Sequence, residues 1–375
     1  MGKAADVLLV AGGSGGHLFP ALSVAHALRR RHPALRVGLV TTRHPRDQRA
    51  LASMPQLLHD PAMQLCCVPH SSTSWWSRLR ALPALWHTAH RLLAEWQPRV
   101  VLGFGGWVSA PLLGAALLRR IPVLLHEQNV QPGRANRWLG RCADGVAVSF
   151  AATRDTWPTV AGKLCVTGNP IRFGEEEVTC AMARQHWGLN GARLTVLAMG
   201  GSGGAQAINE ALPQACAGLT PTRRAHLHVI HLAGAREAAV VERRYQAIGV
   251  AAHIVPFLDQ MAWAYRAADV VVSRAGASTI AELAHFGCPA VFIPYPYARR
   301  HQHANAAHVA SRGGAMVLEQ TPTLTDQLTQ TLTRFVDAPE HLRAMRAHMA
   351  HLDIAGAAER VTEWLCSTLE RTGRP

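Results

Sequence analysis

Short runs of apolar residues alternate with longer, helix-length segments along nearly the whole chain. In the first half these runs end in glycine, proline or polar residues and occupy 7–13, 36–42, 100–106, 122–129, 145–150 and 164–170. In the second half they occupy 194–201, 227–234, 269–276 and 289–296. Continuous apolar strands between helices are typical of parallel sheets that helices cover on both faces. The pattern therefore predicts an α/β fold with two doubly wound, Rossmann-like domains.

The boundary between the two domains is predicted near Gly168, Pro170 and Gly174, where turn residues precede an acidic run. We expect a first domain over 1–168 and a second over 169–355. A C-terminal helix over 356–375 is expected to pack back on the first domain. Ligands of such folds bind beyond the carboxyl ends of the strands, so two facing sheets would frame a cleft between the domains.

Length and composition support a folded chain with two cores. The protein has 375 residues, 49% of them hydrophobic, and a mean hydropathy of +0.04. No apolar run approaches the roughly 20 residues of a membrane-spanning helix, and the first residues match neither a signal peptide nor a myristoylation site. The eight cysteines form no C-x-x-C pair, which favours free thiols over a metal site or disulfides. We therefore expect a cytosolic protein without a covalent anchor.

Basic residues are concentrated in the first part of the chain. Residues 1–160 carry 18 basic and 7 acidic side chains, a net charge of +11, whereas residues 161–375 carry 20 and 17, a net charge of +3. A basic domain favours an anionic partner, which is a membrane lipid, a nucleic acid or a phosphorylated substrate. An arginine-rich proteome would also explain the total of +14, but it explains the asymmetry less well.

The sequence GGSGG follows a predicted strand twice, at 12–16 and at 200–204. Glycine lets the backbone approach an anion, and the next helix presents N–H groups and a partial positive charge at its start. The turns therefore predict phosphate sites, with a tight turn that binds nothing as the alternative. They match neither a P-loop nor the dinucleotide fingerprint, because Leu18 replaces the third glycine and the second strand has no acid at its tip.

His17 directly follows the first of these turns, and no histidine follows the second. A lone histidine is commonly a polar surface residue. At the mouth of a ligand site, however, a neutral imidazole can accept a proton from a hydroxyl near pH 7.

Seven short motifs, taken in order, resemble the MurG family of bacterial UDP-N-acetylglucosamine transferases. They are GGSGGHLFPAL, GFGGWVSAP, HEQN, GNPIR, GGSGGAQAIN, SRAGASTIAEL and HQHANA. No single motif is specific, but seven in this order with similar intervals are. The resemblance extends from about Val7 to the last predicted helix.

This resemblance implies a GT-B glycosyltransferase fold, in which two Rossmann-like domains face an interdomain cleft. It implies an inverting transfer of N-acetylglucosamine from UDP-N-acetylglucosamine to the C4 hydroxyl of the muramoyl sugar of lipid I, which yields lipid II and UDP in peptidoglycan synthesis. No metal and no cofactor are implied. The expected location is the cytoplasmic face of the bacterial inner (plasma) membrane, as a peripheral protein with a role in cell-wall biogenesis, cell shape and cell division.

The resemblance also implies roles for individual residues. His17 is the expected base, with Glu127 as the alternative; Glu127 could instead orient a partner or hold a loop. A helix start suits a diphosphate, a carboxylate suits ribose hydroxyls, and an arginine suits a pyrophosphate. The donor-binding residues implied in this way are Ser14, Gly15, Gly16, Asn129, Arg172, Ser202, Leu258, Ala277, Ser278, Thr279, Ile280, Ala281, Glu282 and Gln302.

Two positions depart from the family pattern. Arg300 stands where an acidic residue is common, and Gly203 stands where a larger residue is usual. The departure at Arg300 affects the expected contacts to the transferred sugar more than those to the nucleotide.

Segment 71–96 mixes tryptophan, leucine and arginine, a composition that suits an interface with anionic lipid. The apolar side chains expected at this interface are Trp75, Trp76, Leu79, Leu82 and Trp86. Pro83 predicts a loop or short turn leading into a helix rather than one unbroken helix. Segment 112–120 adds a second apolar-then-basic edge. The alternative is that these aromatic residues fill the core.

Three other functions remain as alternatives. One is another UDP-sugar enzyme of the GT-B fold, such as a glycolipid synthase or an epimerase. A basic nucleic-acid-binding protein is disfavoured because the sequence contains no nucleic-acid motif and such a role leaves the repeated glycine turn unexplained. A dinucleotide oxidoreductase is disfavoured by the missing third glycine and the missing acid.

Overall fold

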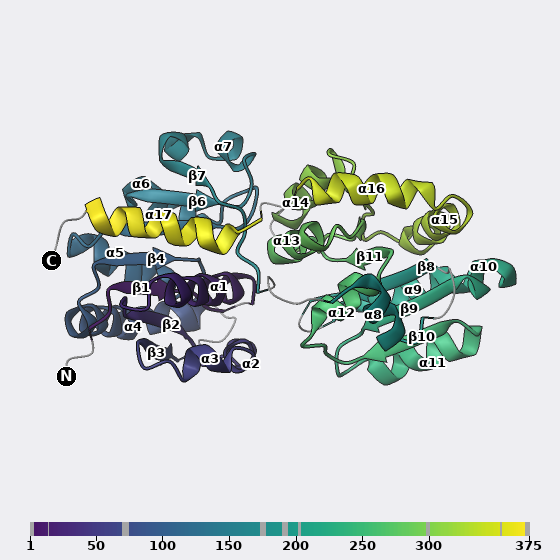
Figure 1. Cartoon of the computed structure of the whole chain (residues 1–375), viewed down its shortest axis with the longest axis horizontal. Coiled ribbons are helices and arrows are strands. Elements are labelled where there is room, and N and C mark those ends of the chain that lie inside the picture. The colour runs from purple at the N-terminus through teal and green to yellow at the C-terminus, as the bar shows by residue number, and fades with distance from the viewer. Residues whose placement is uncertain are drawn as a thin grey trace. The chain divides into compact units, whose positions relative to one another are not determined.

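The computed structural model describes residues 4–13, 15–69, 75–172, 178–189, 194–201, 204–297, 301–352 and 355–371, without the side chains of 75–79. The chain forms two compact units. Unit 1 comprises Met1–Arg172 together with Ile354–Pro375, and unit 2 comprises Phe173–Asp353. Each unit is a parallel sheet with helices packed around it (Figure 1).

Unit 1 is built on a seven-stranded parallel sheet with the order β3-β2-β1-β4-β5-β6-β7. Its strands are β1 (Val7–Val10), β2 (Val37–Thr42), β3 (Met63–Val68), β4 (Val100–Gly103), β5 (Val123–Glu127), β6 (Gly145–Val148) and β7 (Leu164–Val166). Its helices are α1 (Gly15–Arg31), α2 (Pro45–Ala52), α3 (Pro55–Leu58), α4 (Trp75–Trp96), α5 (Ser109–Leu118), α6 (Arg134–Cys142), α7 (Thr153–Thr156), the 3₁₀ helix η1 (Pro158–Lys163) and α17 (Ala357–Arg371).

The alternation of side chains along β1 builds two cores in unit 1. Leu8 and Val10 belong to a cluster with residues of α4 and α5. Val7 and Leu9 belong to a second cluster with residues of α1, α2 and α17. Because successive side chains of a strand point to opposite faces, a central strand covered on both faces is apolar over most of its length, as β1 is. The C-terminal helix α17 thus contributes to the core of unit 1, and it lies beside α1 (Figure 1).

Helix α4 runs unbroken from Trp75 to Trp96, with Pro83 inside it. The prediction of a loop or turn at Pro83 was therefore wrong. Proline removes one hydrogen bond from a helix interior. The buried stripe that follows, which includes Leu85, Ala89 and Leu93, packs into the core and offsets that loss.

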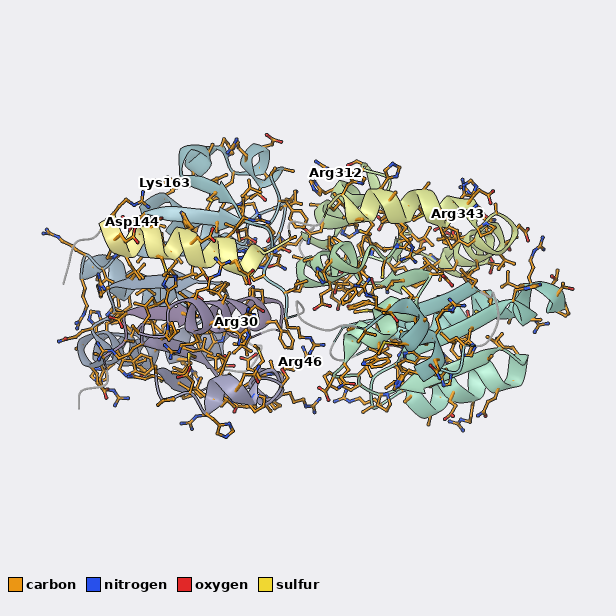
Figure 2. All side chains as sticks on the ribbon, in the orientation of Figure 1. Arg30, Arg46, Asp144, Lys163, Arg312 and Arg343 are labelled. Carbon is orange, nitrogen blue, oxygen red and sulfur yellow. The ribbon has the colours of Figure 1, made fainter. Side chains whose placement is uncertain are left out.

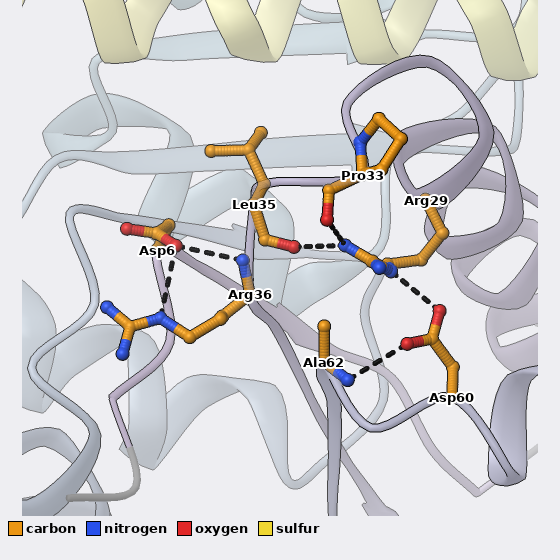
Figure 3. A network of polar contacts seen from close by, with 7 residues as sticks. All are labelled: Asp6, Arg29, Pro33, Leu35, Arg36, Asp60 and Ala62. Atoms are coloured by element: carbon orange, nitrogen blue, oxygen red, sulfur yellow. Dashed lines mark hydrogen bonds and ion pairs between the residues drawn. The ribbon is translucent and has the colours of Figure 1, made fainter. Parts of the chain in front are cut away.

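Polar contacts tie together the edge of the sheet at which the strands of unit 1 begin (Figure 3). Arg29, at the end of α1, donates from Nε to Asp60 Oδ2 (2.7 Å) and from Nη1 to the carbonyls of Pro33 and Leu35. Asp60 Oδ1 accepts from the N–H of Ala62, just before β3 (2.9 Å). On the other side, Asp6 Oδ2 accepts from the backbone N–H of Arg36 (2.8 Å) and pairs with its side chain. These contacts set the starts of β1, β2 and β3.

The side chain of Lys163 caps the C-terminal end of α6. Lys163 Nζ donates to the carbonyls of Arg141 (3.1 Å) and Ala143 (2.9 Å), which lack partners within the helix. Asp144, which follows, accepts from the N–H of Val123 at the start of β5 (2.8 Å). Both side chains are labelled in Figure 2.

Unit 2 is built on a six-stranded parallel sheet with the order β10-β9-β8-β11-β12-β13. Its strands are β8 (Leu194–Met199), β9 (Leu227–Leu232), β10 (Ala251–Val255), β11 (Val270–Ser273), β12 (Ala290–Phe292) and β13 (Ala315–Val317). Its helices are α8 (Cys180–His186), α9 (Gln206–Ala217), α10 (Pro221–Ala225), α11 (Ala238–Ile248), α12 (Met261–Ala267), α13 (Ala277–Phe286), α14 (His301–Ala310), α15 (Leu324–Asp337) and α16 (Glu340–Ala350).

Within the residues that the structure describes, no helix is long and apolar enough to cross a membrane.

Candidate active site

The first glycine turn joins β1 to α1 at the carboxyl edge of the unit 1 sheet. From β1 the strand order runs through β2 to β3 on one side, and from β4 to β7 on the other. The direction of winding reverses between β1 and β4, and doubly wound sheets bind their ligands beyond such a reversal. The turn between β1 and α1 therefore lies where a ligand is expected.

Two glycines after β4 allow the next loop to touch this turn. Gly105 and Gly106 have φ angles of +97° and +88°, which side chains disfavour. A Cβ at Gly106 would overlap the carbonyl oxygen of Gly12, and a Cβ at Gly105 would lie 3.1 Å from Cδ2 of His17. The imidazole of His17 therefore lies directly against the backbone of the β4 loop.

The environment of His17 favours its neutral form. Burial lowers the pKa of His17 below 6.5, while the charges of Glu127 and Asp47 and a hydrogen bond with the Gly12 backbone oppose that change. The side chain of His17 lies in the first turn of α1 and is half-buried, so part of it stays accessible to a ligand. Near neutral pH the imidazole thus carries a lone pair that can accept a hydroxyl proton.

Glu127 ends β5 and holds the loop that follows. Its Oε1 accepts from the backbone N–H (2.9 Å) and Nδ2 (3.1 Å) of Asn129. Its Oε2 accepts from the N–H of Gly133 (3.0 Å) and from Nδ2 of Asn136 (2.7 Å). Four donors thus surround a carboxylate that is 1% exposed. This geometry suits a positioning role and a fixed negative charge better than proton abstraction from a substrate.

Asp47 is an acidic residue that the sequence reasoning missed. It belongs to α2, and its Oδ2 accepts from the backbone N–H of Gly13 (3.0 Å) inside the glycine turn. The sequence shows no acid at the tip of β2, but α2 returns this side chain to the turn. The only sequence signal was its position five residues after β2.

Arg172 and Asn129 also lie in unit 1. The guanidinium of Arg172 lies over the ring of Phe19, 5.0 Å from its centroid, and Phe19 is two residues beyond His17 in α1. Asn129 is held by Glu127, and its carbonyl accepts from the Thr153 hydroxyl (3.3 Å). Gly15 and Gly16 form the start of α1. Ser14 lies outside the described residues.

The second glycine turn occupies the equivalent place in unit 2, between β8 and α9. Gly204 has a φ of +76°, and a Cβ there would overlap the carbonyl oxygen of Ala233, after β9. Asn209 Nδ2 donates to the same carbonyl (2.9 Å) and Asn209 Oδ1 bonds to the buried His231 (3.0 Å). Ser202 and Gly203 lie outside the described residues.

Helix α13 begins where β11 ends, one strand along from β8. Gly276 precedes it, and no side chain caps its start, unlike the starts of α8 and α10. A start of this kind leaves the first-turn N–H groups facing outward with the positive end of the helix dipole, which suits a diphosphate. The predicted donor residues in this helix are Ala277, Ser278, Thr279, Ile280, Ala281 and Glu282, of which Ala277 and Ile280 are buried.

Glu282 is oriented by a tyrosine from the preceding helix. The hydroxyl of Tyr265, in α12, donates to Oε2 of Glu282 (2.6 Å). Tyr265 is another residue of the candidate site that the sequence reasoning missed, since nothing in its local pattern signals the contact.

The turn before α13 is braced from two sides. Arg274 donates to the carbonyls of Ile293 (2.8 Å) and Pro294 (3.2 Å), and the buried Asn305 in α14 donates to the carbonyl of Ala275 (3.2 Å). Gln302, in the same helix, accepts through Oε1 from the N–H of Tyr295 (2.8 Å).

Two further positions of unit 2 that the sequence singled out are Leu258 and Arg300. Leu258 is partly buried in the segment between β10 and α12. Arg300 lies outside the described residues. Over the described ranges, no group of three or more His, Cys, Asp or Glu side chains is arranged to hold a metal ion.

Both units match models of one enzyme family. Residues 7–148 match the glycosyltransferase family 28 N-terminal domain, and residues 195–361 match the glycosyltransferase family 28 C-terminal domain. The chain therefore has the two domains of a family 28 glycosyltransferase, and the predicted GT-B fold class with two Rossmann-like units is confirmed.

Curated relatives define the family more narrowly. The UDP-N-acetylglucosamine--N-acetylmuramyl-(pentapeptide) pyrophosphoryl-undecaprenol N-acetylglucosamine transferase of Nitrosococcus oceani is 40% identical over 363 residues, which cover 95% of this chain and 97% of the relative. The enzyme of the same name from Syntrophotalea carbinolica is 37% identical over 360 residues, 95% and 96% of the two chains. The crystal structure of Acinetobacter baumannii MurG superposes with a TM-score of 0.74 at 29% identity, covering 96% of this chain and 99% of that one.

The chain belongs to this MurG family of glycosyltransferases. A UDP-GlcNAc 2-epimerase from Neisseria meningitidis bound to UDP-GlcNAc also superposes, with a TM-score of 0.70 over 96% of this chain and 99% of that one. At 15% identity it shows the shared fold alone.

Proposed function

We propose that the protein transfers N-acetylglucosamine from UDP-N-acetylglucosamine to the muramoyl sugar of lipid I, forming lipid II and UDP for peptidoglycan synthesis. The names of the full-length relatives support this activity. Among the structural observations, the one that carries the proposal is the partly buried imidazole of His17 against Gly105, at the start of a helix that follows a glycine turn.

In the proposed reaction His17 is the general base. It takes the proton of the C4 hydroxyl of lipid I as that oxygen forms a bond to the anomeric carbon. The bond from the anomeric carbon to the diphosphate oxygen breaks, its electron pair leaves with UDP, and the configuration inverts. A base of this kind is effective near neutral pH because its pKa is lowered by burial.

Glu127 has a positioning role in this proposal. Its four hydrogen bonds keep Asn129 and the loop to Asn136 in place, and its charge faces His17. A carboxylate that accepts four hydrogen bonds has no lone pair directed at a substrate hydroxyl. We therefore favour His17 over Glu127 as the base.

Unit 2 holds the uridine diphosphate in this proposal. The uncapped start of α13 receives the diphosphate, and Glu282, oriented by Tyr265, accepts hydrogen bonds from the ribose hydroxyls. Leu258 flanks the uracil, Gln302 contacts the transferred sugar, and Arg172 stabilises the charge that grows on the leaving diphosphate. Fixed helix starts and the guanidinium supply this stabilisation, and no resident metal or cofactor is invoked.

We further propose that unit 1 binds the cytoplasmic face of the bacterial inner membrane through three neighbouring helices, α4, α5 and α6. Leu82 and Trp86 on α4 are 39% and 40% exposed, Leu118 at the end of α5 is 71% exposed, and Trp138 on α6 is 72% exposed. Exposed arginines surround these apolar side chains, at 80, 91, 119, 120, 134, 137 and 141. We call these side chains together the α4–α6 face. Trp75, Trp76 and Leu79 belong to α4, but their side chains lie outside the described residues.

Aromatic and aliphatic side chains ringed by arginine suit the headgroup region of an anionic bilayer, where lipid I resides. On the α4–α6 face the guanidinium of Arg141 lies over the Trp138 ring at 5.1 Å, and Arg119 donates to the carbonyl of His90, which links α5 to α4.

The function is tested by incubating the purified chain with labelled UDP-N-acetylglucosamine and lipid I in detergent. We expect lipid II and UDP in equal amounts, with no product when lipid I is left out. Conversion of the nucleotide sugar without lipid I would favour the epimerase alternative. Transfer to a glycolipid acceptor but not to lipid I would favour a glycolipid synthase.

A further inference from the structure

Asp47 presents an incompletely bonded carboxylate beside the glycine turn of unit 1. The side chain is fully buried, and its Oδ2 accepts from the Gly13 N–H (3.0 Å) and from the hydroxyls of Thr42 and, at 3.4 Å, Thr41. Its Oδ1 is buried too, yet it has no hydrogen-bond partner among the described residues. Buried carboxylates are normally bonded through both oxygens. The charge of Asp47 is therefore less compensated than usual.

The turn that Asp47 holds also carries His17. Gly13 is bonded to Asp47, and the neighbouring Gly12 shares a hydrogen bond with the imidazole. The carbonyl of Gly12 in turn fills the space left by Gly106. A carboxylate from α2 thus anchors one side of the turn while the imidazole rests on the other.

The charged groups around His17 can be assigned to their elements. Asp47 faces it from α2 and Glu127 faces it from β5, whereas the β4 loop contributes the uncharged Gly105 and Gly106. Arg172 lies over Phe19, two residues further along α1. Of the two acids, Glu127 shares its charge with four N–H donors, whereas Asp47 leaves one oxygen without a donor within the described ranges.

We propose that Asp47 is a positioning residue of the transfer reaction, which anchors the glycine turn beneath His17 and supplies fixed negative charge that stabilises the imidazolium. That imidazolium forms when the C4 hydroxyl proton moves to His17, so the stabilisation is larger in the transition state than in the ground state. The inference rests on the proposed function, because it requires His17 to be the base.

The test compares Asp47→Asn, which keeps the shape and removes the charge, with Asp47→Glu, which keeps the charge. In the ligand-free full-length protein the pKa of His17 is followed by NMR, with the His17→Gln spectrum identifying its signal. Asp47→Asn should lower the pKa of His17, because the imidazolium loses a stabilising charge. It should also lower kcat about tenfold, move the acid limb of the kcat profile to lower pH, and leave the KM for UDP-N-acetylglucosamine unchanged. Asp47→Glu should restore part of the kcat.

Asp60→Asn is the matched control, because it removes a hydrogen-bonded acid of unit 1 that lies in the network of Figure 3 rather than beside His17. It should leave the pKa of His17 and the kcat profile unchanged. A folded Asp47→Asn protein with wild-type values for both would overturn the inference.

A measurement on the wild-type protein covers the case in which Asp47→Asn does not fold. The ¹³C signal of the Asp47 carboxyl should move through the pH range in which His17 titrates, and a flat signal there would overturn the inference. The experiments also distinguish a failure of this inference from a failure of the proposed function. If Asp47→Asn lowers the pKa of His17 but His17→Ala transfers sugar at the wild-type rate, the coupling is real and the proposed base is wrong. If His17→Ala is inactive and Asp47 has no effect on His17, the base stands and this inference fails.

Discussion

The hydroxyl of Tyr265 donates a 2.6 Å hydrogen bond to Oε2 of Glu282, across the contact between α12 and α13. The bond sets the direction of a carboxylate in the second turn of α13, the helix whose start we assign to the nucleotide. Tyr265 itself is 1% exposed, so its role is to orient Glu282 rather than to bind the ligand.

Substitution of Tyr265 by phenylalanine should therefore weaken donor binding more than it slows transfer. Loss of one hydrogen bond to a charged group should raise the KM for UDP-N-acetylglucosamine roughly tenfold while kcat changes less than twofold. Steady-state kinetics and calorimetry with UDP would measure this. Tyr297→Phe is the control, since Tyr297 is 79% exposed. A large fall in kcat at unchanged KM would contradict the assignment.

Replacement of His17 by alanine should abolish most turnover and spare donor affinity. A general base contributes about 10²–10⁴-fold to the rate, so kcat should fall by that factor. His26 lies on the same helix, and His26→Ala should retain wild-type kcat. Unchanged turnover in His17→Ala would remove this residue from the mechanism.

Glu127→Gln should destabilise unit 1 as well as slow transfer. Glutamine keeps one acceptor oxygen but turns an NH₂ group toward two donors, so about two hydrogen bonds to a buried carboxylate are lost. The expected cost is roughly 2–4 kcal/mol, which would lower the urea midpoint of unfolding. Glu95→Gln, at an exposed position on α4, serves as the control. Full stability with reduced kcat would instead point to a direct chemical role.

The network of Figure 3 predicts how the stability of unit 1 depends on pH. The hydrogen bond from Arg29 lowers the pKa of Asp60 below 3.8. A lowered folded-state pKa gives stability that is present above the unfolded-state pKa and is lost as the pH falls through the folded-state value. Asp60→Asn should therefore cost about 1–2 kcal/mol at pH 7. The difference from wild type should shrink below pH 3.8, as thermal unfolding at several pH values would reveal.

The α4–α6 face predicts a membrane-binding defect that is specific to its apolar side chains. Leu118→Asp should weaken binding to anionic vesicles at least tenfold, because burying a leucine side chain is worth about 1.5–3 kcal/mol and the acid repels the lipid. Val240→Asp, on α11 of unit 2, is the control, since Val240 is 39% exposed. The binding should also weaken with salt. Equal binding to neutral vesicles would contradict the proposed interface.

The strands that the sequence pattern missed share one physical property. β3, β10 and β13 are edge strands of their sheets, and their residues are largely exposed or half-buried. A strand with neighbours on both sides is mostly apolar, whereas an edge strand is only partly covered and can lack a continuous apolar run. The nine strands that have a neighbour on both sides were all evident from the sequence.

Local sequence also could not decide how its polar residues are used. Pro83 predicts a break in the helix, yet tertiary packing keeps α4 continuous through this residue. Glu127 allowed two interpretations, and its four hydrogen bonds come from residues up to nine positions further along the chain. Asp47 and Tyr265 carry no local sequence signature, because their hydrogen-bond partners are distant in the chain. Asp47 bonds to Gly13, 34 positions away, and Tyr265 bonds to Glu282, 17 positions away.

By itself the sequence determined the alternation of buried strands and helices, the two glycine turns, and the motifs that place the chain in its family. These features depend on local burial and backbone freedom, which residue type encodes directly. The tertiary structure alone decided which acids face His17, which tyrosine orients Glu282, and where Pro83 is tolerated. Those outcomes depend on distances between segments remote in sequence, which only the packing of the sheets and helices sets.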